Sequence, residues 1–542
     1  MIHPFHCALL LPLAIGFATA RAIADEPDVQ ILDASAMHRY VETFNQHDHT
    51  HFGRTISNEA AAAWMAKSVP RFECPDKDIE KIYHFRWWTY RKHLKETPDG
   101  FVVTEFLPDV KWAGKHNTIN CPAGHHFREG RWINDPKYLD DYSVFWFRKG
   151  GNPRAYSFWA ADSIYQRALT LGNFTLAVDL LPDLIKNYQA WEQTRLCPDG
   201  MFWQIDDRDG MEVSIGKSGK RSTINSYMYG DARAIASIAR IADKFDIEKE
   251  YTAKADALRK LVQDKLWNPK DKFFETLPRT KFEITKTLGP QNSSLVNVRE
   301  LHGFTPWYFN LPEPDKGFEV AWKQLIDPKG FKAPFGPTTV EQRHPEFTIS
   351  YDGHECQWNG PSWPFSTAIT LTALANVLND YPQKDISRED YFETLKAYTQ
   401  SHHLKVDDGS NVPWIDENLN PFNGDWIARS RQKSNPKGPW HGNPLERGKD
   451  YNHSSYCDLI ITGLIGLRPR ADDTVEVNPL LPPGTWDYFC LDRIPYHGHQ
   501  LTILYDRTGE KYQRGTGLRL LADGKEIGSS STLQCLEAQL PK

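Results

Sequence analysis

The chain has 542 residues, a net charge of −6 and a sequence pI near 6.4. It contains no long run of Lys or Arg, so we expect no nucleic-acid partner. Aromatic residues make up 13% of the chain, including 18 Trp. Because Trp and Tyr rings stack on the C–H faces of sugars, this composition suits carbohydrate binding, although any single Trp is more often a core residue.

Residues 1–24 have the layout of a secretory signal peptide. The apolar run 8–17 is too short to span a bilayer, and small residues follow it at positions 18–24. The segment before the run carries only His3 and His6 in place of Lys or Arg. We therefore expect a secreted or periplasmic protein with no membrane association after signal removal. The seven remaining cysteines are scattered without a CxxC zinc pattern, and their pairing stays open.

A lead-in segment is predicted for residues 25–80, with a helix around residues 60–65. The next stretch, residues 82–93, alternates aromatic, basic and imidazole side chains. A structural helix explains its Phe and Trp residues, but its Arg and His residues then need partners. We expect part of this helix to line a substrate cleft.

Residues 100–141 are rich in Gly, His and Trp and are interpreted as a long functional loop. His125 and His126, with Glu129 close behind, suggest a metal site at first sight. However, no further ligand stands out at a matching spacing, so we expect no metal.

Apolar residues recur at helical spacing through most of the chain. The segments are residues 159–171, 174–192, 229–245, 248–266, 318–325, 360–378, 388–399 and 456–466. After Arg470 the pattern changes to strand-like alternation in residues 474–477, 500–505 and 517–521. The sequence therefore predicts a mainly α protein. An (α/α)6 barrel would span residues 81–470, and a small β domain would span residues 471–542.

Four carboxylates lie within seven residues in the segment 206–214. Aromatic neighbours and repulsion between carboxylates both raise the pKa of an acid, as a general acid near neutral pH requires. Clustered Asp residues are also common in solvated turns, so the cluster alone does not decide between the two interpretations.

Two further stretches combine aromatic residues, turns and acids. Residues 358–364 read Trp-Asn-Gly-Pro-Ser-Trp-Pro, with a Pro at the start of a predicted helix. Residues 414–424 contain Glu417, and residues 445–455 contain Glu446 and precede the last predicted helix.

These motifs resemble those of the α/α-toroidal glycoside hydrolases related to processing α-glucosidase I, mannosylglycerate hydrolase and α-L-rhamnosidase. The family pattern Trp-x-Gly-Pro-x-Trp-Pro is met in residues 358–364. Its Gly-Met-Asp-x-Ser, which supplies the acid, resembles residues 210–214 with Glu212 in place of Asp. Its Glu-Asn-Tyr-Asn-Pro-x-x-Gly, which supplies the base, resembles residues 417–424 with Leu419 in place of the aromatic residue.

The resemblance leaves two candidates for the base. Glu417 matches the local motif, whereas Glu446 has the position expected shortly before the final helix. As a whole the chain resembles more closely a bacterial mannosylglycerate-hydrolase-like or family 142-like subgroup, in which β-L-arabinofuranosidase activity is known.

The resemblance implies an inverting exo-glycosidase that needs no cofactor. Glu212 would protonate the glycosidic oxygen, while Glu417 or Glu446 would deprotonate the attacking water. Asp207 and Asp209 are second choices for the acid. They are rather expected to accept sugar hydroxyls, with Asp209 as a substrate contact, or to raise the pKa of Glu212 by repulsion. The other expected substrate contacts are Arg86, Trp87, Trp203, Asn225, Trp358, Trp363 and His453.

Other functions remain open at this point. An α-glucosidase or α-L-rhamnosidase would share the fold and the carboxylate pair. A sugar epimerase or polysaccharide lyase would use His or Tyr instead, for which His84, His93, His125, His126, His354 and His453 are available. A non-catalytic glycan-binding protein would need the aromatic residues but not the acids.

Overall fold

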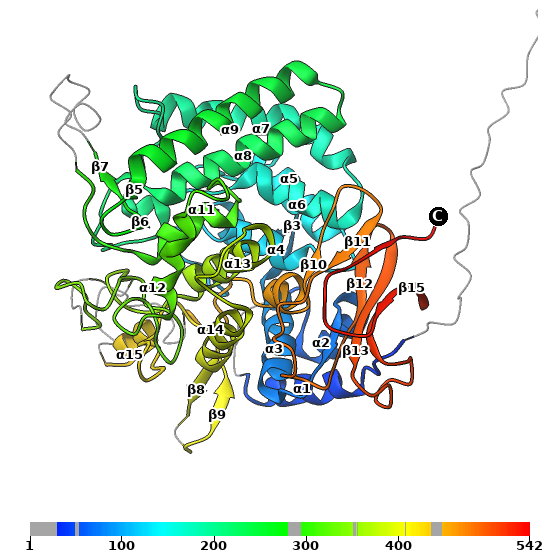
Figure 1. Cartoon of the computed structure of the whole chain (residues 1–542). Coiled ribbons are helices and arrows are strands. Elements are labelled where there is room, and N and C mark those ends of the chain that lie inside the picture. The colour runs from blue at the N-terminus through cyan, green and yellow to red at the C-terminus, as the bar shows by residue number, and fades with distance from the viewer. Residues whose placement is uncertain are drawn as a thin grey trace, which may run out of the picture.

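The structure is a computed structural model that describes residues 30–48, 54–279, 294–350, 354, 356–406, 408–434 and 447–542. Its centre is a ring of helices, and a β-sheet packs at one side of the ring (Figure 1). The predicted signal segment 1–24 and Glu446 lie outside the described residues. Within those residues, every helix is too short or too polar to cross a bilayer.

The inner layer of the ring contains helices that are buried on all sides. The side chains of α13 are buried without interruption from Pro364 to Val377, as expected for a helix surrounded by others. Neighbouring members of the layer contact one another in chain order. The layer comprises α4 (Ala123–Gly130), α6 (Ala160–Leu171), α8 (Ser222–Ile241), α11 (Thr305–Tyr308), α13 (Pro364–Asp380) and η5 (Leu459–Leu464).

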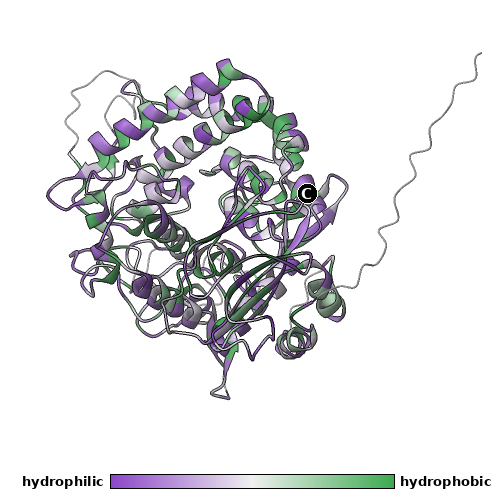
Figure 2. Ribbon diagram, turned by 45° about the vertical axis from the view of Figure 1, so that its right-hand side comes forward, coloured by the Kyte–Doolittle hydropathy of each residue, from purple (hydrophilic) through white to green (hydrophobic). Residues whose placement is uncertain are grey.

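Outer helices bury only one face, as α9 shows. Its buried residues follow one another at intervals of three or four positions, from Tyr251 to Leu266. Hydrophobic and hydrophilic residues alternate along most helices in Figure 2. The outer layer comprises α3 (Lys77–His93), α5 (Lys137–Arg148), α7 (Thr175–Arg195), α9 (Phe245–Leu266), α12 (Lys323–Ile326) and α14 (Arg388–Ser401). In addition, α1 (Ser35–Gln46) and α2 (Asn58–Ser68) cover α3.

Buried polar contacts close the ring between its first and last inner helices. The Glu129 carboxylate accepts hydrogen bonds of 2.9 to 3.2 Å from the backbone N–H groups of residues 456, 457 and 458. Arg131 forms a fully buried ion pair of 2.7 Å with Asp458. These contacts close the helical pairs into the predicted (α/α)6 barrel, which is confirmed.

The inner helices approach one another closely where they carry glycine. A Cβ placed on Gly124 of α4 would lie 2.1 Å from the ring of Trp159, at the start of α6. Any side chain at position 124 would therefore push these two helices apart.

The C-terminal region forms two antiparallel sheets beside the ring. The larger has the strand order β1-β12-β13-β14-β15, with β1 (Arg71–Glu73), β12 (Tyr488–Tyr496), β13 (His499–Asp506), β14 (Gly517–Ala522) and β15 (Lys525–Ser530). The smaller contains β10 (Leu467–Arg468), β11 (Thr474–Val477) and β16 (Leu536–Gln539). Because β1 comes from the predicted lead-in segment, an N-terminal strand completes the larger C-terminal sheet by pairing with β12.

Short two-stranded sheets connect parts of the ring. They are β2 (Leu94–Thr97) with β3 (Gly100–Val103), β4 (Gly219–Lys220) with β7 (Leu277–Pro278), β5 (Trp267–Asn268) with β6 (Phe273–Phe274), and β8 (His403–Lys405) with β9 (Asn411–Pro413). One further helix, α15 (Ile427–Ser434), follows the Glu417 segment.

The interpretation of residues 100–141 as one long loop is wrong. This stretch contains β3, all of α4 and the start of α5. Helix α4 is short, buried on nearly every side and contains two glycines and two histidines. It therefore lacks both the apolar stripe and the residue preferences by which an amphipathic helix is recognised.

Candidate active site

The segment 358–364 connects the two loops that carry the predicted acid and base. The backbone N–H of Trp358 donates a hydrogen bond of 3.0 Å to the carbonyl oxygen of Glu212. Ser362 and Leu419 exchange two backbone hydrogen bonds, each 3.0 Å long. Pro364 then begins α13. Both carboxylate loops are thus attached to the N-terminal end of one buried helix.

Two Trp rings of this segment form one wall of the site. Trp358 and Trp363 stack with ring centroids 4.5 Å apart and an interplanar angle of 15°. The indole N–H of Trp363 donates to the carbonyl oxygen of Gln357 at 2.8 Å, which fixes the ring. His453 lies edge-on to Trp363, with ring centroids 6.0 Å apart. Three of the predicted substrate contacts therefore lie together.

The loop around Glu212 is held from beneath by Arg221. Its guanidinium forms a fully buried ion pair of 2.7 Å with Asp209. The same group donates to the Ser214 hydroxyl at 3.1 Å and lies 3.2 Å from the Met211 sulfur. Met211 and Ser214, which match the motif Gly-Met-Asp-x-Ser, thus contact the same guanidinium. Glu212 lies between them.

The backbone at this loop is strained. Val213, next to Glu212, has a φ of +65°, a conformation that β-branched residues rarely adopt. Gly210 also has a positive φ, +70°, which glycine adopts without strain. Strained residues persist where surrounding contacts hold them, and they concentrate at functional sites.

Glu212 is half-buried and has the properties of a proton donor. Burial raises the pKa of its carboxyl to about 8, and repulsion from Asp207 and Glu417 adds to the rise. At neutral pH the carboxyl is therefore mostly protonated. A general acid must carry its proton at the working pH, and Glu212 meets that requirement.

Glu417 is buried and differs in its partners. Its carboxylate accepts a short hydrogen bond from the Arg447 guanidinium, which also forms an ion pair with it. Its other oxygen accepts from the Cys356 thiol at 3.3 Å. The neighbouring Asp416 accepts from the Glu417 backbone N–H at 2.8 Å, and burial followed by repulsion from Glu417 raises the pKa of Asp416 to about 7.

Glu212 and Glu417 form a pair of carboxyl groups with different charged neighbours. Within the described residues, half-buried Glu212 forms no ion pair and its pKa is raised, whereas Glu417 is paired with the Arg447 guanidinium. Carboxyl groups separated in this way can supply an acid and a base to the same reaction.

A third carboxyl at the site, Glu105, was not anticipated from the sequence. It is 5% exposed and follows β3, and the Tyr451 hydroxyl donates a short hydrogen bond to it. Burial raises the pKa of Glu105 to about 8, and repulsion from Glu417 contributes. The available signal was its position within the stretch 100–141, which was expected to be functional.

Neutral imidazoles and Arg86 lie deeper in the ring. Burial lowers the pKa values of His125 and His453 well below the usual range, and the Arg86 charge lowers them further. Neither ring makes a hydrogen bond to the described residues through its nitrogens. Arg86 itself donates to the Ser454 carbonyl oxygen at 2.7 Å and contacts His402 at 3.1 Å. The two rings therefore have polar atoms to offer to a ligand.

Other predicted contacts have partners within the fold. Both oxygens of Asp209 bond to side chains, those of Ser157, Arg221 and Thr223. The amide of Asn225 bonds to the backbone of Phe202 and Arg221. Trp87 is fully buried among Tyr83 and Tyr90, and Trp203 lies against the guanidinium groups of Arg195 and Arg279. Contact of these four residues with substrate stays a prediction.

The residues suggested as metal ligands point to different partners. His126 bonds to the Tyr142 hydroxyl and to the Asn452 carbonyl oxygen, and Glu129 binds the backbone of the last inner helix. His125 lies among aromatic rings. Across the described parts of the chain, no three His, Cys, Asp or Glu side chains come together as metal ligands.

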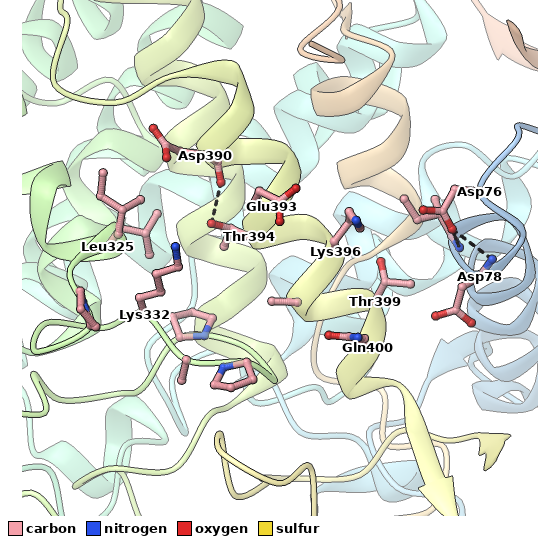
Figure 3. A pocket seen from close by; sticks show the side chains of 17 residues that line it. Asp76, Asp78, Leu325, Lys332, Asp390, Glu393, Thr394, Lys396, Thr399 and Gln400 are labelled. Carbon is pink, nitrogen blue, oxygen red and sulfur yellow. Dashed lines mark hydrogen bonds between the residues drawn. The ribbon is translucent and has the colours of Figure 1, made fainter. Parts of the chain in front are cut away.

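Another cavity lies on the outer surface of the ring. It is a groove of about 720 Å³ between α14, the start of α3 and the segment 325–337 (Figure 3). Two of its acids cap helices: Asp76 accepts from the first backbone N–H groups of α3, and Asp390 accepts from the Ser387 N–H. Neither Glu212 nor Glu417 lines it, so the carboxylate pair at the inner helix ends remains the better candidate site.

A family model described as the mannosylglycerate hydrolase MGH1-like glycoside hydrolase domain matches residues 115–454. This match spans more than half of the chain and includes Glu212, the segment 358–364 and Glu417. The chain belongs to this glycoside hydrolase family. Residues 467–528 match a second model, the C-terminal domain of glycosyl hydrolase family 65.

Solved structures agree with the family. A chain named "Sialidase" is 42% identical, with a TM-score of 0.85, and the match covers 94% of this chain but 45% of that one. The present chain thus spans less than half the length of that relative. Rhamnosidases of Bacillus sp. GL1 and Dictyoglomus thermophilum are 11% and 13% identical, with TM-scores of 0.53 and 0.52. The matches cover 84% and 85% of this chain, and 41% and 45% of theirs, and show a shared fold.

Two of the histidines considered for an alternative chemistry, His93 and His126, stabilise the ring. His93 bonds to the Asp450 carbonyl oxygen at 2.6 Å, and His126 bonds to that of Asn452 at 2.6 Å. Burial lowers the pKa of each to about 3. Both rings therefore hold the segment 450–452 in place beside the carboxylates.

Proposed function

We propose that this chain is an inverting exo-glycosidase in which Glu212 is the general acid and Glu417 the general base. The observation that carries the proposal is the contrast between the two carboxyls. Glu212 is buried with a pKa raised to about 8, and Glu417 is ion-paired with Arg447. The two interact electrostatically and are joined through one helix start.

In the proposed reaction Glu212 transfers its proton to the glycosidic oxygen as the bond from that oxygen to the anomeric carbon breaks. Glu417 removes a proton from a water molecule, whose oxygen bonds to the anomeric carbon from the opposite face. The products are the free sugar with inverted configuration and the released alcohol. Such a mechanism requires carboxyl groups about 6.5 to 9.5 Å apart, with space for the water.

A β-L-arabinofuranoside is the proposed substrate, because the chain resembles the family 142-like subgroup in which that activity is known. The name of the 42% identical relative does not define the substrate here, since it belongs to a chain more than twice as long. α-L-Rhamnosides and α-glucosides are alternatives on the same fold. We further propose that the protein is exported, on the basis of the signal-like residues 1–24.

Hydrolysis of synthetic glycosides by the mature protein tests this function. The panel contains β-L-arabinofuranosyl, α-L-rhamnosyl, α-glucosyl and α-sialosyl aryl glycosides, and the variants are Glu212→Gln, Glu417→Gln and Glu446→Gln. We expect cleavage of the arabinofuranoside, with losses of about 10²–10⁴-fold in kcat for the first two variants. A full loss in Glu446→Gln with activity retained in Glu417→Gln would move the base to position 446. Full activity in all three variants would refute the assigned site.

A further inference from the structure

Glu105 is anchored on both sides by the segment that ends at His453. Its carbonyl oxygen accepts a hydrogen bond of 3.1 Å from the Asn452 N–H, and the Tyr451 hydroxyl donates to its Oε1. Tyr451 in turn packs on His453, with ring centroids 3.8 Å apart. The Glu105 carboxyl is therefore fixed in position beside one of the predicted substrate contacts.

The charge environment of Glu105 differs from that of Glu417. Within the described part of the chain Glu105 forms no ion pair, whereas the nearby Arg447 guanidinium bonds to Glu417. Burial, with repulsion from Glu417, raises the pKa of Glu105 to about 8. The neutral acid is thus the main form at neutral pH.

The hydrogen bond from Tyr451 determines where the proton of that neutral acid resides. Oε1 already accepts from the phenol, so Oε2 is the oxygen left to carry the proton. Among the described residues Oε2 has no hydrogen-bond partner, and it is not one of the fully enclosed polar atoms that lack one, so it remains accessible to a ligand. Glu105 therefore offers one oriented O–H donor.

This donor lies close to the reacting carboxyls. The Arg447 guanidinium, which forms the ion pair with Glu417, lies 5.5 Å from the ring centroid of Phe106, the residue after Glu105. Repulsion between Glu105 and Glu417 agrees with this closeness. A sugar held between acid and base would present its hydroxyl oxygens, which are hydrogen-bond acceptors, to this region.

We propose that Glu105 binds the substrate as a neutral acid, donating a hydrogen bond from Oε2 to a hydroxyl oxygen of the sugar whose glycosidic bond is cleaved. The proposal rests on the glycosidase function proposed above. It makes Glu105 a substrate-binding residue whose proton is not transferred in the reaction, and it gives Tyr451 the role of a positioning residue.

A glutamine at position 105 separates this role from acid–base catalysis. The amide retains the shape, an N–H donor and an oxygen that accepts from Tyr451, whereas alanine retains none of them. We expect Glu105→Ala to raise KM by about 5- to 150-fold, and Glu105→Gln to recover most of that loss because its amide still donates a hydrogen bond. Glu212→Gln, which removes a transferred proton, should instead lose kcat. Tyr451→Phe should raise KM less than Glu105→Ala.

Binding of the free sugar provides a readout that needs no turnover. The dissociation constant of L-arabinose, measured by calorimetry between pH 6 and 9, should rise for the wild type above about pH 8. The Glu212→Gln variant, in which position 212 no longer titrates, should keep this rise, and the double variant Glu212→Gln with Glu105→Gln should lose it. L-Rhamnose and glucose are measured in parallel.

The outcomes distinguish this proposal from the proposed function. If the wild type cleaves a glycoside but Glu105→Gln is as impaired as Glu105→Ala, the neutral-donor role is overturned and the glycosidase remains. A pH-independent dissociation constant for the wild type also overturns it. If the wild type neither cleaves a glycoside nor binds any of the three sugars, both proposals fail.

Discussion

The backbone N–H of Trp358 donates a 3.0 Å hydrogen bond to the carbonyl oxygen of Glu212. Four residues later, Ser362 pairs with Leu419 through two more backbone hydrogen bonds. The segment 358–364 thereby fixes the loops of Glu212 and Glu417 relative to each other. Since both contacts involve backbone atoms, the geometry depends on the conformation of the segment, which its two prolines restrict.

The pH dependence of hydrolysis should report the Glu212 carboxyl. Its pKa is raised to about 8, so the proton-donating form predominates below that pH and is lost as the pH rises through it. We predict that kcat/KM falls above about pH 8. Repulsion from Asp207 contributes to the raised pKa, so Asp207→Asn should shift this decline to lower pH. A decline at the same or higher pH in that variant would contradict the assignment.

Replacement of the proposed base should be rescued by a small anion. Glu417→Gln removes the group that deprotonates water, and we expect kcat to fall by about 10²–10⁴-fold. Azide needs no deprotonation and should restore turnover, giving a glycosyl azide of inverted configuration, which NMR identifies. The matched control is Glu212→Gln assayed with an alkyl glycoside, whose leaving group still needs a proton. If azide instead restores turnover to Glu212→Gln and not to Glu417→Gln, Glu212 is the base and Glu417 the acid.

The Asp209–Arg221 ion pair should be essential to the loop that carries Glu212. Both groups are fully buried, and removing one partner leaves an uncompensated charge. We predict that Arg221→Met lowers the free energy of unfolding by about 3–5 kcal/mol. The double variant Arg221→Met with Asp209→Asn should lose less than the sum of the single losses. Urea denaturation measures these values, and strict additivity would show that the pair is not coupled.

Gly210 tests the backbone requirement of the same loop. Its φ is +70°, and a Cβ there would lie 2.5 Å from the Cys121 sulfur. Gly210→Ala should therefore destabilise the protein by more than the roughly 1–2 kcal/mol cost of the left-handed conformation alone. In a Cys121→Ala background the excess should disappear. If the cost of Gly210→Ala is the same in both backgrounds, the thiol contact is not responsible.

Local motifs and amphipathic periodicity were sufficient to predict the barrel. The predicted strand 474–477 coincides with β11, because apolar and polar residues alternate regularly there. The sequence did not reveal α4 or β12: α4 lacks an apolar stripe, and β12 is interrupted by a bulge between Leu491 and Ile494. Likewise, Glu105 and Glu417 are more than 300 positions apart, and only the closed ring brings them together.

Side-chain roles were harder to predict than positions. Asp209 lies in the acidic segment beside Glu212, yet its oxygens bond to Ser157, Arg221 and Thr223. Nothing in the order of residues distinguishes a carboxylate that supports a loop from one that faces a ligand. That distinction depends on which distant side chains approach each oxygen.

The central claim is that Glu212 donates the proton to the departing oxygen. It is tested most directly by how the loss of kcat/KM in Glu212→Gln depends on the leaving group. The account predicts a loss in kcat/KM of about 10²–10⁴-fold on alkyl glycosides. On a 2,4-dinitrophenyl glycoside of the same sugar, whose leaving group departs without protonation, the loss should nearly disappear. An equal loss on both substrates would contradict the account and show that Glu212 is not the general acid.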